Sequence, residues 1–332
     1  MDPRRSASEP VDVRAARGSG RTSLSRVGLT GVEQVIELSI DQRSPQPFPA
    51  RLECFVELDA TRQATHVSRF REVFTDALHE VVVRAAGTRA ERLAQEIAER
   101  VRERHHARRA EVTIAARFPE PRPAGVSGTP TQAISMLYGT AVASERGTRR
   151  MVGVSAQRTT ASPYAQDGLV ARARERLAAA GFSEARIARI VDEVPVGTHS
   201  QLGVGTLHLG CPEGRALEFD VAVLLSIVEA AMSSEIFERV AHSDEAAVVA
   251  RAHRRPRFVE DCVRAMIAGV VARFAGVPDE VFVSAAQENI ETIHGHDVIA
   301  ERAGLLGDLR RELASGQAVA HQTSMRAWLD AG

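Results

Sequence analysis

Residues 288–297, near the end of the chain, are dense in side chains that bind metal ions or transfer protons. They contain two glutamates, two histidines and an aspartate, and they follow an apolar, strand-like run at 281–285. Glu291 and His294 are three positions apart, so on a helical turn they would share one face and could meet a single ion or polarised water. Solvated turns after strands also contain His and Glu. The spacing alone therefore leaves two interpretations, a metal or acid–base site and an ordinary turn.

Composition limits the class of protein. The 332 residues are 44% hydrophobic and 4% aromatic, enough for one large domain or two of ordinary size. A net charge of -1 gives no indication of a nucleic-acid partner or a membrane surface. No apolar run approaches the roughly 20 residues that span a bilayer. The three cysteines, Cys54, Cys211 and Cys262, form no CxxC pair, which favours a reducing compartment and argues against a thiolate-rich zinc site. We therefore expect a cytoplasmic protein.

The first half of the chain begins with a polar tail. Residues 1–26 are rich in Arg and Ser and lack the apolar segment of a secretion signal, so 1–27 is expected to be disordered. Apolar periodicity then predicts strands at 32–40, 50–58, 110–117 and 133–142, and helices at 70–81 and from Thr88 onward. Thr88 and Glu91 have the spacing of a reciprocal helix cap.

The second half repeats this order loosely. Strands are expected at 151–157, 199–209, 218–223 and 281–285, and helices at 167–180, 183–194, 224–240 and within 244–274. Paired strands and paired helices that occur twice predict an α+β protein of two similar units. Each unit would be an antiparallel sheet with two helices on one face, the first at 28–150 and the second, with most of the candidate site residues, at 151–332.

Glu260 lies at the edge of a long apolar helical stripe. A carboxylate in that position can face a pocket wall. The alternative is a surface glutamate that pairs with Arg264, four residues later.

Four segments, in matching order and spacing, resemble motifs of the GTP cyclohydrolase type IB family, bacterial and archaeal enzymes of the tunnelling fold. Residues 65–70, THVSRF, are similar to H-M-S-R-F, and residues 194–201, VPVGTHSQ, resemble V-P-V-A-T-H-N-Q. Residues 243–245 and 256–261 are similar to P-D-E and P-x-F-V-E-D, and residues 291–297, ETIHGHD, to E-S-I-H-x-H-D. The resemblance extends from about Gly28 to about Glu301.

The resemblance implies two tandem tunnelling-fold units and a set of site residues. The family's metal ligands correspond to His199, Glu245 and His294, and Glu291 would serve as a further ligand or a proton carrier, so that Glu291, His294 and His199 are the expected catalytic residues. Substrate-binding roles correspond to Glu260, which would accept hydrogen bonds from a guanine edge, and to Arg69 with His66, which would meet the triphosphate.

The chain departs from the family at two positions. The family's C-P-C segment, whose first cysteine is a metal ligand, corresponds here to residues 161–166, ASPYAQ, so Ser162 replaces the ligand thiolate. A serine hydroxyl stays protonated near neutral pH and is at best a weak or water-bridged ligand. Leu202 replaces an arginine and removes a phosphate contact that the family has. The remaining N and O donors suit Mn²⁺, Fe²⁺ or a loosely held Zn²⁺.

Two functions follow from the resemblance as expectations. The first is a GTP cyclohydrolase of pterin and folate biosynthesis: a metal-dependent hydrolase that opens the imidazole ring of GTP and releases formate to give a dihydroneopterin phosphate. The second is an altered or inactive paralogue that binds a purine or pterin, which the loss of the thiolate at Ser162 favours. The expected partners are GTP or a related purine and further copies of the chain, with no nucleic acid and no membrane.

Overall fold

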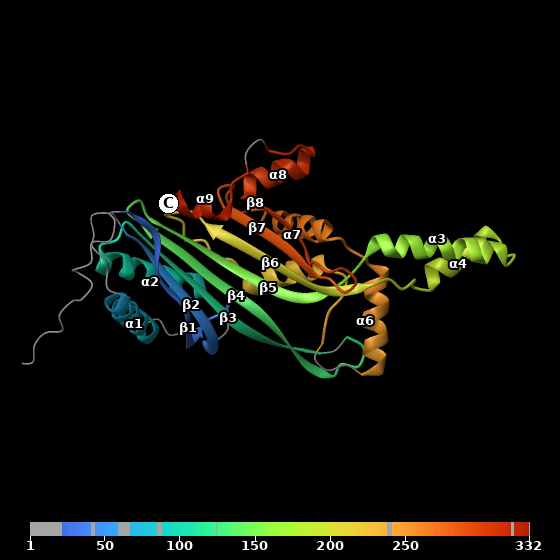
Figure 1. Ribbon diagram of the computed structural model, residues 1–332, viewed down its shortest axis with the longest axis horizontal. Coiled ribbons are helices and arrows are strands. Elements are labelled where there is room, and N and C mark those ends of the chain that lie inside the picture. The colour runs from blue at the N-terminus through green and yellow to red at the C-terminus, as the bar shows by residue number, and fades with distance from the viewer. Residues whose placement is uncertain are drawn as a thin grey trace, which may run out of the picture.

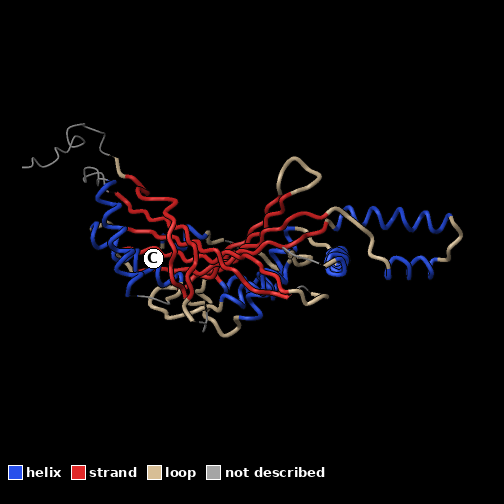
Figure 2. Tube along the Cα trace, turned by 90° about the horizontal axis from the view of Figure 1, so that it is seen from below, coloured by secondary structure: helices blue, strands red, loops and turns tan. Residues whose placement is uncertain are grey.

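The computed structural model describes residues 22–40, 44–58, 67–84, 88–123, 125–237, 241–319 and 322–331. Eight strands form one antiparallel sheet, and each strand pairs with the next along the chain. Helices α2, α5 and α7 lie against one face of the sheet, and α3 and α4 project beyond its end (Figures 1 and 2). None of the helices within these ranges is both long and apolar enough to cross a bilayer.

The first half contains β1 (Leu24–Leu38), β2 (Gln46–Leu58), α1 (Val67–Arg84), α2 (Ala90–His105), β3 (Arg109–Pro123) and β4 (Pro130–Ser144). The second half contains β5 (Thr148–Ala161), α3 (Pro163–Ala179), α4 (Glu184–Glu193), β6 (Ser200–Cys211), α5 (Val221–Ala231), α6 (His242–Arg254), α7 (Val259–Arg273), β7 (Phe282–Ile290), β8 (Val298–Leu305), α8 (Leu306–Ser315) and α9 (Met325–Asp330).

The predicted α+β class with antiparallel strands is confirmed. The strands make a single continuous sheet, in which β5 pairs with β4 on one side and with β6 on the other. The expected boundary between residues 150 and 151 therefore falls inside β5. The division into two repeated units stays a prediction. Residues 1–21 lie outside the described part, and β1 begins at Leu24.

Three local predictions are wrong. The second helix begins at Ala90 after Arg89, because Thr88 forms a bridge with Leu38 and Glu91 accepts a hydrogen bond from the Arg89 side chain at 2.7 Å. The segment 218–223 is not a strand: Asp220 caps α5 by accepting a hydrogen bond from the backbone N–H of Val223 at 3.0 Å. Residues 291–297 form a loop between β7 and β8, not a helical turn, and β8, α8 and α9 were not expected.

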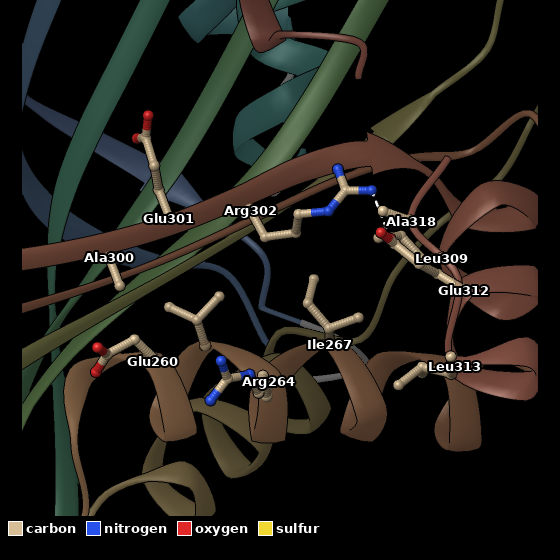
Figure 3. A pocket seen from close by; sticks show the side chains of 12 residues that line it. Glu260, Arg264, Ile267, Ala300, Glu301, Arg302, Leu309, Glu312, Leu313 and Ala318 are labelled. Atoms are coloured by element: carbon tan, nitrogen blue, oxygen red, sulfur yellow. Dashed lines mark hydrogen bonds and ion pairs between the residues drawn. The ribbon is translucent and has the colours of Figure 1, made fainter. Parts of the chain in front are cut away.

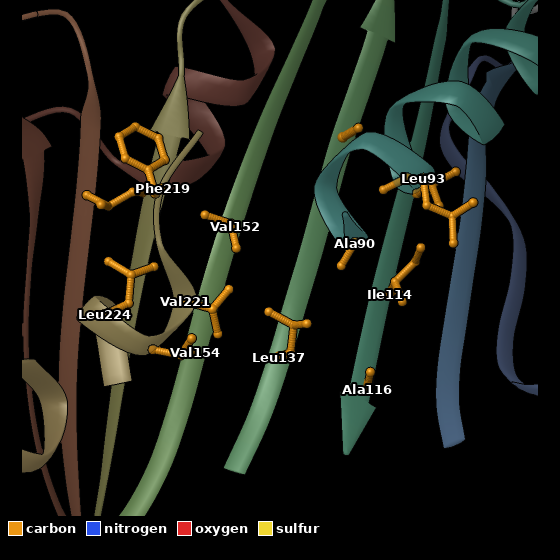
Figure 4. Packing of buried hydrophobic residues seen from close by; sticks show 14 of the residues in the cluster. Ala90, Leu93, Ile114, Ala116, Leu137, Val152, Val154, Phe219, Val221 and Leu224 are labelled. Carbon is orange, nitrogen blue, oxygen red and sulfur yellow. The ribbon is translucent and has the colours of Figure 1, made fainter. Parts of the chain in front are cut away.

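The core lies between the sheet and the helices that cover it. Strand alternation places Leu137 of β4 and Val154 of β5 on the covered face. Leu93 of α2 and Leu224 of α5 pack onto the same face (Figure 4). Burying each such side chain contributes about 1.5–3 kcal/mol, which fixes the face of the sheet that meets the helices.

Strands β4 and β5 separate at one end of the sheet. Their pairing stops at Met136 and Ser155, whereas β5 stays paired with β6 as far as Ala161 and Ser200. The chain after α5 occupies the gap, where the backbone N–H of Thr159 donates to the carbonyl of Ser234 at 3.0 Å. A cavity of about 630 Å³ opens at this fork.

Asp244, in the segment that resembles P-D-E, ties α6 to the loop between β3 and β4. Its carboxylate is buried and accepts hydrogen bonds from the backbone N–H groups of Val126 at 2.9 Å and Ser127 at 2.8 Å, and from the Ser127 hydroxyl at 2.5 Å. The backbone N–H of Ala241 donates to the same group at 3.1 Å. Donors favour the charged carboxylate, led by the Ser127 hydroxyl, and they lower the pKa of Asp244 to about 2.

We expect Asp244→Asn to lower the melting temperature near neutral pH, because a neutral amide oxygen accepts these bonds less strongly. Folding lowers the pKa of this carboxyl, so its charged form stabilises the folded protein at pH values above its ordinary pKa of 3.8. This contribution is lost as the pH falls towards about 2. The gap between wild type and variant should therefore narrow below about pH 4 in thermal unfolding followed by circular dichroism. Asp192→Asn, on the exposed side of α4, is the control. An equal gap at every pH would contradict this account.

Candidate functional site

The candidate residues meet at the edge of the sheet where β5 and β7 end and β6 begins. The last residue pairs at this edge are Ala161 with Ser200 and Leu202 with Ile290. Ser162 directly follows β5, His199 directly precedes β6, and Glu291 directly follows β7. The backbone N–H of Ser162 donates to the carbonyl of His199 at 3.1 Å. We call the group Ser162, His199, Gln201, Glu291 and His294 the strand-end site.

Two imidazoles from different segments face each other in this site. The rings of His199 and His294 have centroids 6.3 Å apart in an edge-to-face arrangement. His296 stacks on His294 with centroids 5.5 Å apart. The hydroxyl of Thr292 donates to the carbonyl of Ser200 at 3.3 Å, which holds the loop 291–297 against the start of β6.

Glu291 is held from two sides. Its backbone N–H donates to Asp297 Oδ1 at 3.0 Å, so the loop closes on itself. Its side-chain Oε1 accepts a hydrogen bond from Gln201 Nε2 at 3.2 Å. The helical geometry first expected for Glu291 and His294 is wrong, but the loop brings both residues to the same site.

Several buried polar atoms at the strand ends lack a hydrogen-bond partner in the described structure. They include His199 Nδ1, Gln201 Oε1 and Glu291 Oε2, together with Thr160 Oγ1 and Gln287 Oε1 on the adjacent strands. Buried polar atoms are nearly always hydrogen-bonded, and each one left unpaired costs about 1–3 kcal/mol. Their concentration at one end of the sheet indicates that water, an ion or a ligand completes the site.

The predicted metal ligands are only partly brought together. His199 and His294 are close, and Ser162 adjoins His199 through the backbone, whereas Glu245 lies exposed on the first turn of α6. Within the described ranges, no three His, Cys, Asp or Glu side chains are placed to hold one ion. The donor types that are present, imidazole nitrogen and carboxylate oxygen, fit a divalent cation, and His199 Nδ1 and Glu291 Oε2 are free to bind one. The ligand set stays a prediction.

Glu260 lies exposed in the first turn of α7, at the edge of a cavity of about 480 Å³ between α7, β8 and α8 (Figure 3). Arg264 pairs with Asp261 at 3.3 Å, so the expected alternative, a pair between Glu260 and Arg264, is not formed. At the other end of the cavity Arg302 and Glu312 form an ion pair at 2.6 Å.

The start of α7 lies beside the strand-end site. The backbone N–H of Arg257 donates to the carbonyl of Ala161, the residue before Ser162, at 3.0 Å. Of the other two predicted substrate-binding residues, His66 lies outside the described residues, and Arg69 lies in α1 with its side chain outside the described part.

Three residues at the site were not predicted from the sequence. Gln201 contacts Glu291, and Asp297 holds the loop. Gln166 donates to the carbonyls of Val196 at 2.8 Å and His253 at 2.5 Å, which fixes the segment that leads to His199. Gln201 and Asp297 lie inside the resembling motifs, and this is the only signal in the sequence that could have identified them.

The chain is similar to proteins of known name over most of its length. The family model described as type I GTP cyclohydrolase folE2 matches residues 11–300. GTP cyclohydrolase MptA of Methanococcus aeolicus is 34% identical over 308 residues, which cover 91% of this chain and 99% of that protein. GTP cyclohydrolase MptA of Methanocaldococcus jannaschii is 34% identical over 309 residues, which cover 92% of this chain and 98% of that protein.

Among solved structures, a hyper-thermostable AgUricase mutant superposes with a TM-score of 0.50 at 8% sequence identity, over 87% of this chain and 94% of that one. At this identity the likeness concerns the fold alone. The family model extends over most of the chain and includes every residue of the strand-end site. The chain therefore belongs to the type I GTP cyclohydrolase family.

Proposed function

We propose that this protein is a GTP cyclohydrolase of pterin biosynthesis, which opens the imidazole ring of GTP and releases formate to give a dihydroneopterin phosphate. Family membership supports the proposal, as do two curated relatives that carry the name GTP cyclohydrolase. The observation that carries it is the convergence of His199 and Glu291 at the strand ends, each with a buried polar atom that lacks a partner.

Glu260 would hold the substrate. A carboxylate accepts two hydrogen bonds from the N–H groups of a guanine edge. Glu260 is exposed and forms no ion pair within the described ranges. It lies three residues after Arg257, whose backbone N–H is bonded to Ala161, the residue before Ser162. A guanine bound there could extend its five-membered ring towards His199 and Glu291. Arg69 and His66 would meet the triphosphate, as the family motif implies.

Hydrolysis at C8 needs an acceptor for the proton of the attacking water and a donor for the departing ring nitrogen. Glu291 Oε2 is the free acceptor, and the imidazoles of His199 and His294 can pass protons. His199, His294 and Glu245, with Ser162 as a weak ligand, would hold Mn²⁺, Fe²⁺ or Zn²⁺. Such an ion lowers the pKa of water and thereby supplies a nucleophile near neutral pH.

We further propose that the protein is a type IB member of the family and forms a cytoplasmic homo-oligomer. Each half of the chain would be one tunnelling-fold unit. The first half has the order β1, β2, α1, α2, β3, β4, and the second half also contains four strands with helices between its two pairs. Glu245 is exposed, so it could join a site across a subunit boundary.

The alternative function is purine or pterin binding without turnover. Ser162 favours it, because the family's thiolate ligand is missing from a site that is otherwise retained.

Purified protein incubated with GTP and Mn²⁺, Fe²⁺ or Zn²⁺ should release formate and yield a fluorescent pterin after oxidation. Glu291→Gln should abolish most of this turnover, because it removes the free proton acceptor. Purine binding by calorimetry without formate release under any metal would support the alternative and contradict cyclohydrolase activity.

Ser162→Cys should tighten Mn²⁺ or Zn²⁺ binding, measured by calorimetry, because a thiolate is a stronger ligand than a hydroxyl. Ser183→Cys, at the start of α4, is the matched control. Equal metal affinity in the wild type and Ser162→Cys would contradict the placement of the ion beside His199 and His294.

Glu260→Gln should raise the KM for GTP by roughly 10–100-fold, since a hydrogen bond to a charged group contributes about 1.5–3 kcal/mol. Glu301→Gln is the matched control, because Glu301 borders the same cavity but points away from it (Figure 3). The KM for GTP of both variants is measured by steady-state kinetics. An equal change in KM in the two variants would count against a guanine bound to Glu260.

A further inference from the structure

Gln201 is the second residue of β6, and 7% of the residue is exposed. It pairs across the sheet with Thr160 of β5 and points to the face covered by helices. A carboxamide in this position has little access to bulk water. Its hydrogen bonds must therefore go to the protein or to a bound molecule.

The bond between Gln201 and Glu291 leaves one carboxylate oxygen free. Gln201 Nε2 donates to Oε1 at 3.2 Å, while Oε2 is buried without a partner. A carboxylate only accepts hydrogen bonds, so the amide must present its NH₂ group to it, and the reverse orientation would bring two oxygens together. The same bond leaves Gln201 Oε1 without a partner.

A second layer of carboxamides lies behind this pair on β7. Gln287 Nε2 donates to Asn289 Oδ1 at 3.1 Å, and both residues are buried. The Gln287 amide lies over Gly203 of β6, where a Cβ would come within 2.6 Å of Nε2 and 2.9 Å of the Thr160 methyl group. Glycine at 203 therefore makes room for the amide beside Gln201.

The side chains that support the Glu291 carboxylate carry no charge, which affects how well it accepts a proton. Gln201, Gln287 and Asn289 are neutral, so they can fix a carboxylate without the ion pair that an arginine or lysine would form. A charged partner would neutralise Glu291 and weaken it as a proton acceptor.

We infer that Gln201 is a positioning residue, which holds Glu291 through Oε1 and directs the free Oε2 towards the reacting group. The expected effect on GTP turnover rests on the proposed function. The expected effect on the orientation of the Glu291 carboxylate does not. Gln287 and Asn289 form the buried wall against which Gln201 is placed.

The test uses Gln201→Met, which keeps the volume of the side chain and removes the N–H donor. If packing alone mattered, this variant would be tolerated. It should lower kcat for GTP by roughly 10–100-fold, the usual effect of losing a group that orients a reacting one. The KM should change by less than about threefold, because the substrate contacts remain. Gln132→Met, at an exposed position on β4, is the matched control.

Crystal structures of the wild type and Gln201→Met give a readout that does not depend on turnover. The Glu291 carboxylate should leave its wild-type position in the variant. If it stays in place, the inference is overturned, whatever the kinetics show. If the wild type does not turn over GTP, the proposed function fails, and the position of Glu291 in the two structures still decides the role of Gln201.

Discussion

The register of β6 between β5 and β7 is the constraint on which the candidate site depends. Side chains alternate along a strand, so a shift of one residue would move Gln201 to the opposite face of the sheet. In the observed register, Gln201 lies opposite Thr160, and Asn289 lies opposite Gly203. The side chains of Gln201, Thr160 and Asn289 then point under the helices, and the segments that carry His199 and Glu291 leave the sheet side by side.

The covered face of the sheet changes character along its length. Towards the middle it is apolar, as at Val154, Leu207 and Ala285, and these residues join the main core. At the strand ends the same face carries Gln201 and Gln287, although buried polar groups destabilise a fold unless they are paired. A core built for stability alone would continue the apolar pattern. Here the polar side chains are bonded instead, Gln201 to Glu291 and Gln287 to Asn289, so the buried polar end of the face is organised around the Glu291 carboxylate.

Much of the sheet could be predicted from the sequence, because β2 and β3 alternate regularly between buried residues and residues that are partly or fully exposed. β8 lacks that pattern, since Arg302 occupies its interior and is neutralised by Glu312 of the following helix. Such a pair is visible only in three dimensions. The site residues came from motif resemblance, whereas Gln201 was missed because a glutamine within a strand has no periodic signal, and its partner is 90 positions away.

A crystal structure of the Glu291→Gln variant with GTP and Mn²⁺ would test the central claim, that the strand-end site is where the purine reacts. We predict the guanine edge on Glu260 and C8 beside His199 and position 291. The fork between β4 and β5 offers a second cavity, of about 630 Å³, lined by Arg117, Tyr138 and Gln157 among others. GTP bound in that cavity, with the strand-end site free of nucleotide, would contradict the claim.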